Sequence, residues 1–159
     1  MNAAAFVVPI DYAAFGQMLY PGVFLLTFLA NGSVVLPVPY VPIVMRVAEV
    51  APSATLVVVA AAAGSMLGES VSYFVGRAGK HIVSGSRVYR SLERIVHRPV
   101  VAGVFLFILA APLNPFFDLA GLAAGALGLR FSIFAGAVFL GRLVRFTAIV
   151  WIGAGFIRL

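Results

Sequence analysis

Apolar positions run almost without interruption along this chain, and the polar positions gather in one central segment. Residues 77–98 contain six lysine or arginine side chains, two histidines and the acid Glu93. The segments on both sides hold apolar stretches as long as a membrane-crossing helix needs, roughly 20 residues. The pattern predicts an all-α membrane protein whose single domain, residues 1–159, is divided into two halves by a basic linker.

The two halves repeat each other at an offset of 73 residues without a gap, so that residue 39 falls on residue 112. Identical residues in this register include two prolines and a glycine: Pro39 and Pro112, Pro42 and Pro115, and Gly68 and Gly141. Apolar matches are common in such a chain, but prolines and a glycine in one register indicate an internal structural repeat. We place repeat 1 at about 26–76, the linker at 77–98 and repeat 2 at about 99–153.

Each repeat begins with an apolar stretch that prolines interrupt, at 37–42 and at 110–115. A helix from Val100 to Ala111 would reach only ~18 Å, whereas the hydrocarbon core is ~30 Å thick. Broken helices survive at membrane depth only where protein or water satisfies the freed backbone groups. We therefore expect residues 26–55 and 99–128 to form re-entrant helical hairpins with these prolines at their tips.

Helices long enough to span the membrane are expected at 56–76 and 131–153, and an extra N-terminal helix within 3–25. The positive-inside rule places the linker 77–98 in the cytoplasm. The two hairpins then enter from opposite faces, so the repeats are inverted. Discontinuous helices that meet near the midplane of an inverted repeat are the usual substrate site of transporters.

The linker also carries apolar residues at helical spacing, namely Val88, Leu92 and either Ile95 or Val96. This spacing predicts a short amphipathic helix that lies on the cytoplasmic interface. The arginines on its other faces are expected to contact lipid phosphates. These arginines are Arg87, Arg90, Arg94 and Arg98.

Composition and charge exclude several classes of function. The chain is 63% hydrophobic and 10% charged, whereas about a quarter of the residues in soluble domains are charged. The net charge of +6 gathers mainly in the linker, so orientation and anionic lipid explain it better than nucleic acid. Cysteine is absent, and no catalytic triad, phosphate loop or metal-binding motif is present. We therefore expect no enzyme activity, no cofactor and no metal site.

Several charged side chains lie inside the predicted membrane segments: Glu69, Asp118, Arg142 and Arg145. Such charges must be paired or hydrated, and they mark functional sites by default. Asp118 equally suits the first turn of the returning helix, and Glu69 suits a structural ion pair. Asn114 suits a turn between the hairpin limbs. The arginines either pair with these acids or hold a lipid phosphate, which guanidinium matches in shape.

Small residues recur every four positions along 56–76: Ala60, Gly64, Gly68, Ser72 and Gly76. Such a stripe allows another helix to approach closely, and we assign the same packing role to Gly121 and Gly141. Glu69 adjoins the stripe, so it is expected to face protein or a cavity rather than lipid.

Three strings of residues resemble signatures of the DedA superfamily, also called the VTT domain. The first is Gly64-Ser65-Met66-Leu67-Gly68-Glu69, followed by Tyr73-Phe74-Val75-Gly76-Arg77. The second is Pro112-Leu113-Asn114-Pro115-Phe116-Phe117-Asp118-Leu119-Ala120-Gly121, which is most similar to the branch that contains the eukaryotic vacuole membrane protein. The third is Gly141-Arg142 with Arg145, which resembles a Gly-Lys pair and a further lysine.

The resemblance covers roughly residues 26–153 and implies two facing re-entrant hairpins. Eukaryotic members are associated with phospholipid scrambling, and bacterial relatives with undecaprenyl phosphate and proton-dependent membrane homeostasis. Many bacterial members carry an acid directly after a Pro-Gly in the first hairpin, whereas this chain has none between Pro37 and Ile43. A proton-coupled mechanism is therefore not carried over.

These observations predict a lipid transporter or scramblase in a prokaryotic plasma membrane, with phospholipid or undecaprenyl phosphate as its partner. Its groove is expected to hold Glu69, Asn114, Asp118, Arg142 and Arg145. Two alternatives stay open: an ion- or proton-coupled carrier of small solutes, and a non-transporting biogenesis factor. A homo-oligomer is also left open.

Overall fold

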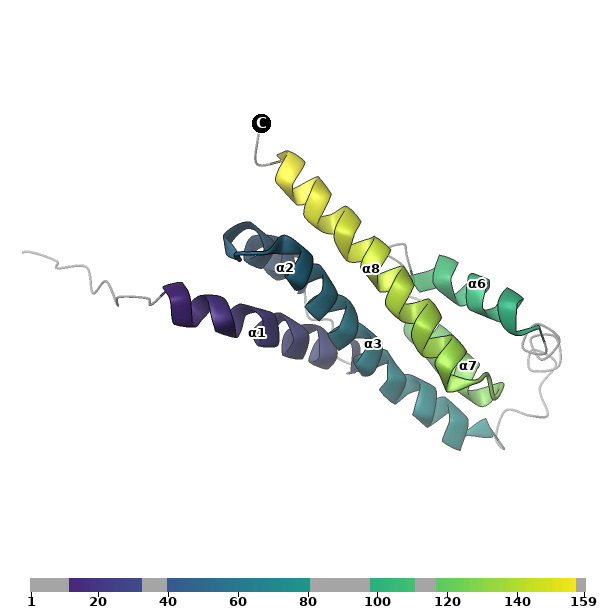
Figure 1. Ribbon diagram of the computed structural model, residues 1–159. Helices are drawn as coiled ribbons and strands as arrows, with labels where there is room; N and C mark the ends of the chain where they lie inside the picture. Colours follow the sequence, from purple (N-terminus) through teal and green to yellow (C-terminus); the bar gives the residue numbers. More distant parts are fainter. Residues whose placement is uncertain (1–11, 33–39, 81–97, 111–116, 157–159) are drawn as a thin grey trace, which may run out of the picture.

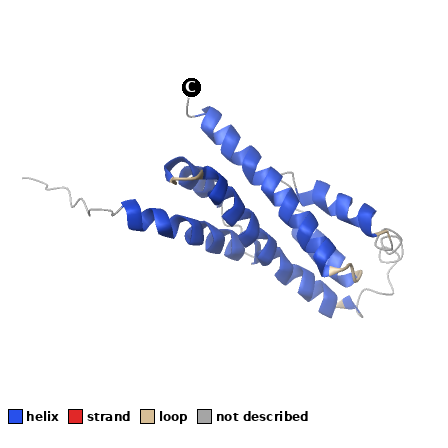
Figure 2. Cartoon of the chain, in the orientation of Figure 1, coloured by secondary structure: helices blue, strands red, loops and turns tan. Residues whose placement is uncertain are grey.

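The computed structural model describes residues 12–32, 40–80, 98–110 and 117–156, and these residues are helical apart from short turns (Figures 1 and 2). The helices are α1 (Tyr12–Gly32), α2 (Tyr40–Val50), α3 (Ala54–Ala78), α6 (Pro99–Ala110), α7 (Phe117–Ala126) and α8 (Phe131–Phe156). No strand occurs among the described residues, so the predicted all-α class is confirmed.

Two helices, α3 and α8, are long and apolar enough to cross a membrane. They run antiparallel, because Tyr73 near the end of α3 packs on Phe134 near the start of α8. At the other end, Val58 of α3 lies in one cluster with Phe146 of α8. The predicted spanning helices at 56–76 and 131–153 are therefore present, each extended by a few residues.

The remaining helices pack around this antiparallel pair (Figure 1). Helices α1 and α7 lie against α3, α6 lies against α8, and α2 contacts both long helices. Helices α2, α6 and α7 have 11, 12 and 10 residues, which is about half of what a membrane span requires. Helix α6 begins at Pro99, where the missing N–H leaves no intrahelical hydrogen bond unmade.

The N-terminal part differs from the expectation in two respects. The helix expected within 3–25 is not separate from the first hairpin, because α1 runs from Tyr12 to Gly32 through Pro21. Membrane helices tolerate an internal proline when neighbouring groups satisfy the freed carbonyl. Pro42, expected at a hairpin tip, is the third residue of α2, and the first turn of a helix accepts proline. The other expected tip residues, Pro39, Pro112 and Pro115, lie outside the described residues.

Short turns fix the ends of the long helices. The Ser53 hydroxyl caps α3 by accepting a hydrogen bond of 3.3 Å from the backbone N–H of Leu56. Gly128 connects α7 to α8 at φ +73°, a backbone conformation that glycine adopts without steric cost. The first turn brings α3 back against α2, and the second brings α8 back against α7.

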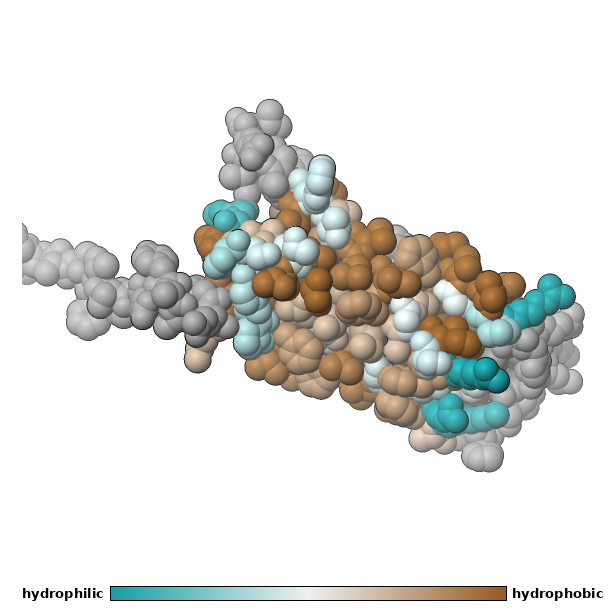
Figure 3. All heavy atoms as spheres, in the orientation of Figure 1, coloured by the Kyte–Doolittle hydropathy of each residue, from teal (hydrophilic) through white to brown (hydrophobic). Residues whose placement is uncertain are grey.

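The outer surface is strongly apolar along the middle of the molecule (Figure 3). Large apolar side chains on α3 and α8 are exposed, among them Leu67, Phe74, Leu140 and Trp151. One end of the molecule instead exposes basic residues at or just after the end of α3 and directly before α6 and α8: Arg77, Lys80, Arg98 and Arg130. An exposed apolar band of this extent is typical of a surface that contacts lipid.

Candidate transport site

One face of α3 carries three buried polar side chains at helical spacing: Ser65, Glu69 and Ser72. We call these residues the polar stripe. Residues separated by four and seven positions share a face, so the stripe extends ~10 Å along the helix. Ser70 of α3 is also buried, but its hydroxyl donates to the Met66 carbonyl oxygen within the same helix at 2.8 Å. The polar stripe is therefore a face of α3 with polar groups available inside the membrane segment.

Glu69 and Arg142 form a buried ion pair between the two long helices, with Arg142 Nη2 donating to Glu69 Oε1. Both side chains are almost fully enclosed, with 1% and 2% of their surface exposed. Removing two charges from water costs several kcal/mol per ion, which close pairing offsets only in good geometry. The second carboxylate oxygen, Glu69 Oε2, is buried and has no hydrogen-bond partner among the described residues.

Arg145 lies one turn beyond Arg142 on α8 and is half-buried. Its guanidinium carbon lies 6.0 Å from the centre of the Tyr40 ring, at the first residue of α2. Within the described part of the chain, its Nε atom is buried without a hydrogen-bond partner and the side chain forms no ion pair. The cation is therefore held by an aromatic face, and it keeps donor capacity toward an anion.

A second polar cluster joins α1 to the start of the polar stripe. Asn31 Nδ2 donates to the Thr27 carbonyl oxygen at 2.7 Å and to Ser65 Oγ at 2.9 Å. All three side chains are buried. In hydrocarbon such hydrogen bonds hold helices together, with an average contribution of about 0.6 kcal/mol each. Ser72, at the far end of the stripe, has a buried hydroxyl with no partner in the described helices.

The glycines near the site lie at points of close backbone approach. A Cβ on Gly64 would collide with the Phe24 carbonyl oxygen of α1, and one on Gly68 would lie 2.5 Å from the Phe28 carbonyl oxygen. On Gly76 it would collide with Leu122 of α7.

In the second half, a Cβ on Gly121 would lie 3.4 Å from Ser72 Cβ. On Gly141 it would lie 2.6 Å from Ala110 Cβ of α6. The glycines therefore bring α1 and α7 onto α3, and α6 onto α8.

The structure brings together three of the residues that the sequence singled out, Glu69, Arg142 and Arg145. Asp118 is the second residue of α7, and its side chain lies outside the described part of the structure. Asn114 and the linker arginines Arg87, Arg90 and Arg94 also lie outside it. Arg98 is exposed directly before α6. Arg46 and Glu49 pair at 2.8 Å on α2, away from the site.

Sequence reasoning missed Thr27, Asn31, Ser65 and Tyr40 as parts of this site. Asn31 interrupts an apolar run, and Ser65 precedes Glu69 by one helical turn. Those two signals could have identified the α1–α3 cluster. Tyr40 carried no comparable signal, because its contact with Arg145 depends on how α2 packs against α8.

Comparison with known proteins gives one match. Residues 36–155 match the VTT domain family, which covers both long helices and the ion pair. No curated protein and no solved structure matches the chain. Since the match spans most of its length, the chain belongs to the VTT domain family, and it is a membrane protein of the DedA group.

Proposed function

We propose that this protein is a lipid transporter or scramblase that moves an anionic headgroup past the polar stripe while the acyl chains stay in the bilayer. Arg145 carries the proposal, because it is a membrane-embedded cation without an ion pair among the described residues, next to a pair that is already neutral. Guanidinium binds phosphate oxygens in a planar, bidentate way. Phospholipid and undecaprenyl phosphate both carry such a group.

We further propose that the two halves form an inverted repeat of re-entrant hairpins. Glu69 and Arg142 lie 73 residues apart, which is the offset at which the sequence halves repeat. Equivalent residues touch each other only on a two-fold axis, so this contact supports an axis that passes through the ion pair. The packing of the helices agrees: α1 lies on α3 as α6 lies on α8, and α7 lies on α3 as α2 lies on α8.

The basic end of the molecule is proposed to face the cytoplasm of a prokaryotic cell, in keeping with the positive-inside rule. Thr55 and Ser132 are exposed near opposite ends of the molecule, at the starts of α3 and α8. In this cysteine-free chain, Thr55→Cys is expected to react with an impermeant thiol reagent on intact cells. Ser132→Cys is expected to react only after permeabilisation, and the reverse result would invert the orientation.

The function is tested by reconstituting the purified protein into liposomes with a fluorescent anionic phospholipid and following bleaching by an impermeant reductant. Arg145→Gln is expected to slow lipid movement at least about tenfold, the loss expected for a hydrogen bond to a charged group. Arg145→Lys should retain part of the rate. Arg46→Gln, on an exposed pair outside the site, is the matched control.

Wild-type liposomes that bleach no further than empty liposomes would reject lipid movement and favour a non-transporting biogenesis factor. Equal rates in Arg145→Gln and wild type would reject the headgroup contact. A second function, a cation-coupled carrier, is favoured by two buried oxygens that have no partner within the described helices, Glu69 Oε2 and Ser72 Oγ. In that case transport should depend on a sodium or proton gradient, whereas scrambling should not.

A further inference from the structure

A groove of about 500 Å³ lies between α6 and α8, apart from the polar stripe. One face of each helix forms its walls: Pro99, Gly103 and Phe107 on α6, and Ile133, Ala137 and Leu140 on α8. All of these side chains are apolar. Beyond Phe107 and Leu140, the last lining residues on each helix, α6 and α8 meet at Ala110 and Gly141. Neither Glu69 nor Arg142 lines the groove.

Glycine and alanine keep the groove open. Gly103 has no side chain, and a Cβ there would already lie 3.3 Å from Ile133 Cγ2. Val100 and Val104 also line the groove and are 76% and 53% exposed, so the groove opens onto the exposed apolar surface. Pockets of this size accommodate a large part of a small apolar ligand.

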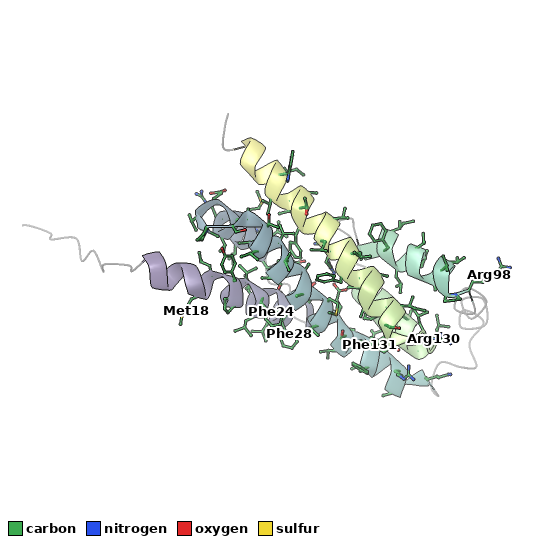
Figure 4. The ribbon with its side chains drawn as sticks, in the orientation of Figure 1. Met18, Phe24, Phe28, Arg98, Arg130 and Phe131 are labelled. Atoms are coloured by element: carbon green, nitrogen blue, oxygen red, sulfur yellow. The ribbon has the colours of Figure 1, made fainter. Side chains whose placement is uncertain are left out.

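Two arginines stand at one end of the groove (Figure 4). Arg98 directly precedes Pro99, and Arg130 directly precedes Phe131 at the start of α8. Both are exposed. The acidic side chains among the described residues are Glu49 and Glu69, and neither lies at this end. The mouth of the groove is therefore positive, and its interior is apolar.

We propose that this groove is a binding site for an anionic phospholipid of the leaflet at the basic end. One acyl chain lies between α6 and α8, and the phosphate contacts Arg98 and Arg130. An apolar slot with a basic mouth complements a ligand that has one anionic head and a hydrocarbon chain. The site rests on the membrane assignment and not on lipid transport, so either proposal can fail without the other.

The test uses the purified full-length chain in detergent and measures lipid retained in native mass spectrometry, with thermal unfolding as a second readout. Dioleoyl phosphatidylglycerol is the probe. Dioleoyl phosphatidylcholine controls for the chains, and glycerol 3-phosphate controls for the headgroup alone. We expect phosphatidylglycerol to be retained and to raise the unfolding midpoint, and neither control to match it.

Two kinds of variant test the two parts of the site. Arg98→Gln with Arg130→Gln should weaken retention about thirtyfold, the factor that loss of two interfacial charges implies. Gly103→Leu should fill the slot and abolish retention. Gly136→Leu is its matched control, because a Cβ at Gly136 on α8 would meet no described atom within 4 Å. Should Gly103→Leu not fold, the exposed double arginine variant decides alone.

Equal retention of phosphatidylcholine, or unchanged retention in the double arginine variant, would overturn the site. A change from dimer to monomer in Gly103→Leu with lipid retention unchanged would also overturn it, since the groove would then be a contact between two copies of the chain.

Discussion

In the proposed repeat, the packing of α1 on α3 corresponds to that of α6 on α8, yet the two pairs of helices pack by different means. Between α1 and α3, Gly64 and Gly68 bring the two backbones together, and Asn31 bonds across to Ser65. Between α6 and α8, the backbones approach closely at Gly141, where a Cβ would lie 2.6 Å from Ala110 Cβ, whereas Gly103 lines the groove.

The offset of the proposed repeat identifies sequence differences that accompany this difference in packing. At the offset of 73 residues, Gly64 corresponds to Ala137 and Ser65 corresponds to Val138. Gly64 lies against the α1 backbone, whereas Ala137 lines the groove. Ala137 adds a methyl group relative to Gly64, and Val138 has methyl groups where Ser65 has a hydroxyl. These differences accompany the change from a tight, hydrogen-bonded contact to an apolar slot. The contact of α1 with α3 is therefore closed, whereas that of α6 with α8 leaves an apolar groove.

The largest difference in stability is expected between two single variants in which leucine replaces either Gly64 or Ala137. Gly64→Leu places a side chain where the Phe24 carbonyl oxygen and the Thr27 hydroxyl already lie, so α1 must move away. Overpacking is destabilising even where side chains can adjust, and a backbone carbonyl adjusts least. We expect Gly64→Leu to yield little folded protein and Ala137→Leu to fold normally, measured by size-exclusion chromatography and thermal unfolding in detergent.

Leu67→Val, on the exposed face of α3, controls for substitution on that helix. Equal stability of Gly64→Leu and Ala137→Leu would show that the two contacts are equally loose, and the comparison would lose its basis.

The next effect concerns the ion pair that joins the two halves. Glu69→Gln leaves Arg142 as a buried charge without its carboxylate, and breaking such a pair costs ~3–5 kcal/mol. The double variant Glu69→Gln with Arg142→Gln removes both charges and should recover most of the lost thermal stability. If the pair lies on a two-fold axis, exchanging the residues, Glu69→Arg with Arg142→Glu, should be tolerated better than either single change.

A single variant as stable as wild type would show that the pair contributes nothing to the fold. Exchange variants no better than the singles would argue against equivalent surroundings for the two positions. Recovery of stability without recovery of lipid movement would place Arg142 in the transport path as well.

Much of the fold followed from periodicity and length. The two long helices and the 12-residue helix from Pro99 depend on hydrophobic runs and a proline, which are local properties. The division into two repeats stays a prediction. The continuity of α1 through Pro21 did not follow. Proline usually breaks helices in water, and only packing against α3 and a low-polarity environment decide otherwise.

The site was predictable to the extent that isolated charges mark it. Glu69, Arg142 and Arg145 stood out because charge is costly in an apolar segment. The sequence left open which acid pairs with which arginine, since this depends on the crossing of α3 and α8. The sequence also did not indicate the groove, which forms only where small side chains on α6 and α8 come together.

The smallest effect is expected at Tyr73, one of two buried aromatic residues that pack near opposite ends of the α3–α8 pair. Tyr73 is buried, donates to the Leu129 carbonyl oxygen at 2.5 Å and accepts from Arg77 Nη1 at 2.9 Å. Its counterpart at the repeat offset, Phe146, is equally buried and has no hydroxyl. The basic end is therefore held by hydrogen bonds that a phenylalanine cannot make at the opposite end.

Tyr73→Phe should lower the free energy of unfolding by about 0.6 kcal/mol and at most ~1.7, the range found for hydrogen bonds between membrane helices. The ring still packs on Phe134, so its centroid contact at 4.8 Å is kept. Thermal unfolding of Tyr73→Phe and Tyr73→Ala separates the contribution of the hydroxyl group from that of the ring, because only the alanine variant also loses the aromatic packing. A loss in Tyr73→Phe as large as that in Glu69→Gln would mean that the hydroxyl, rather than the central ion pair, holds the halves together.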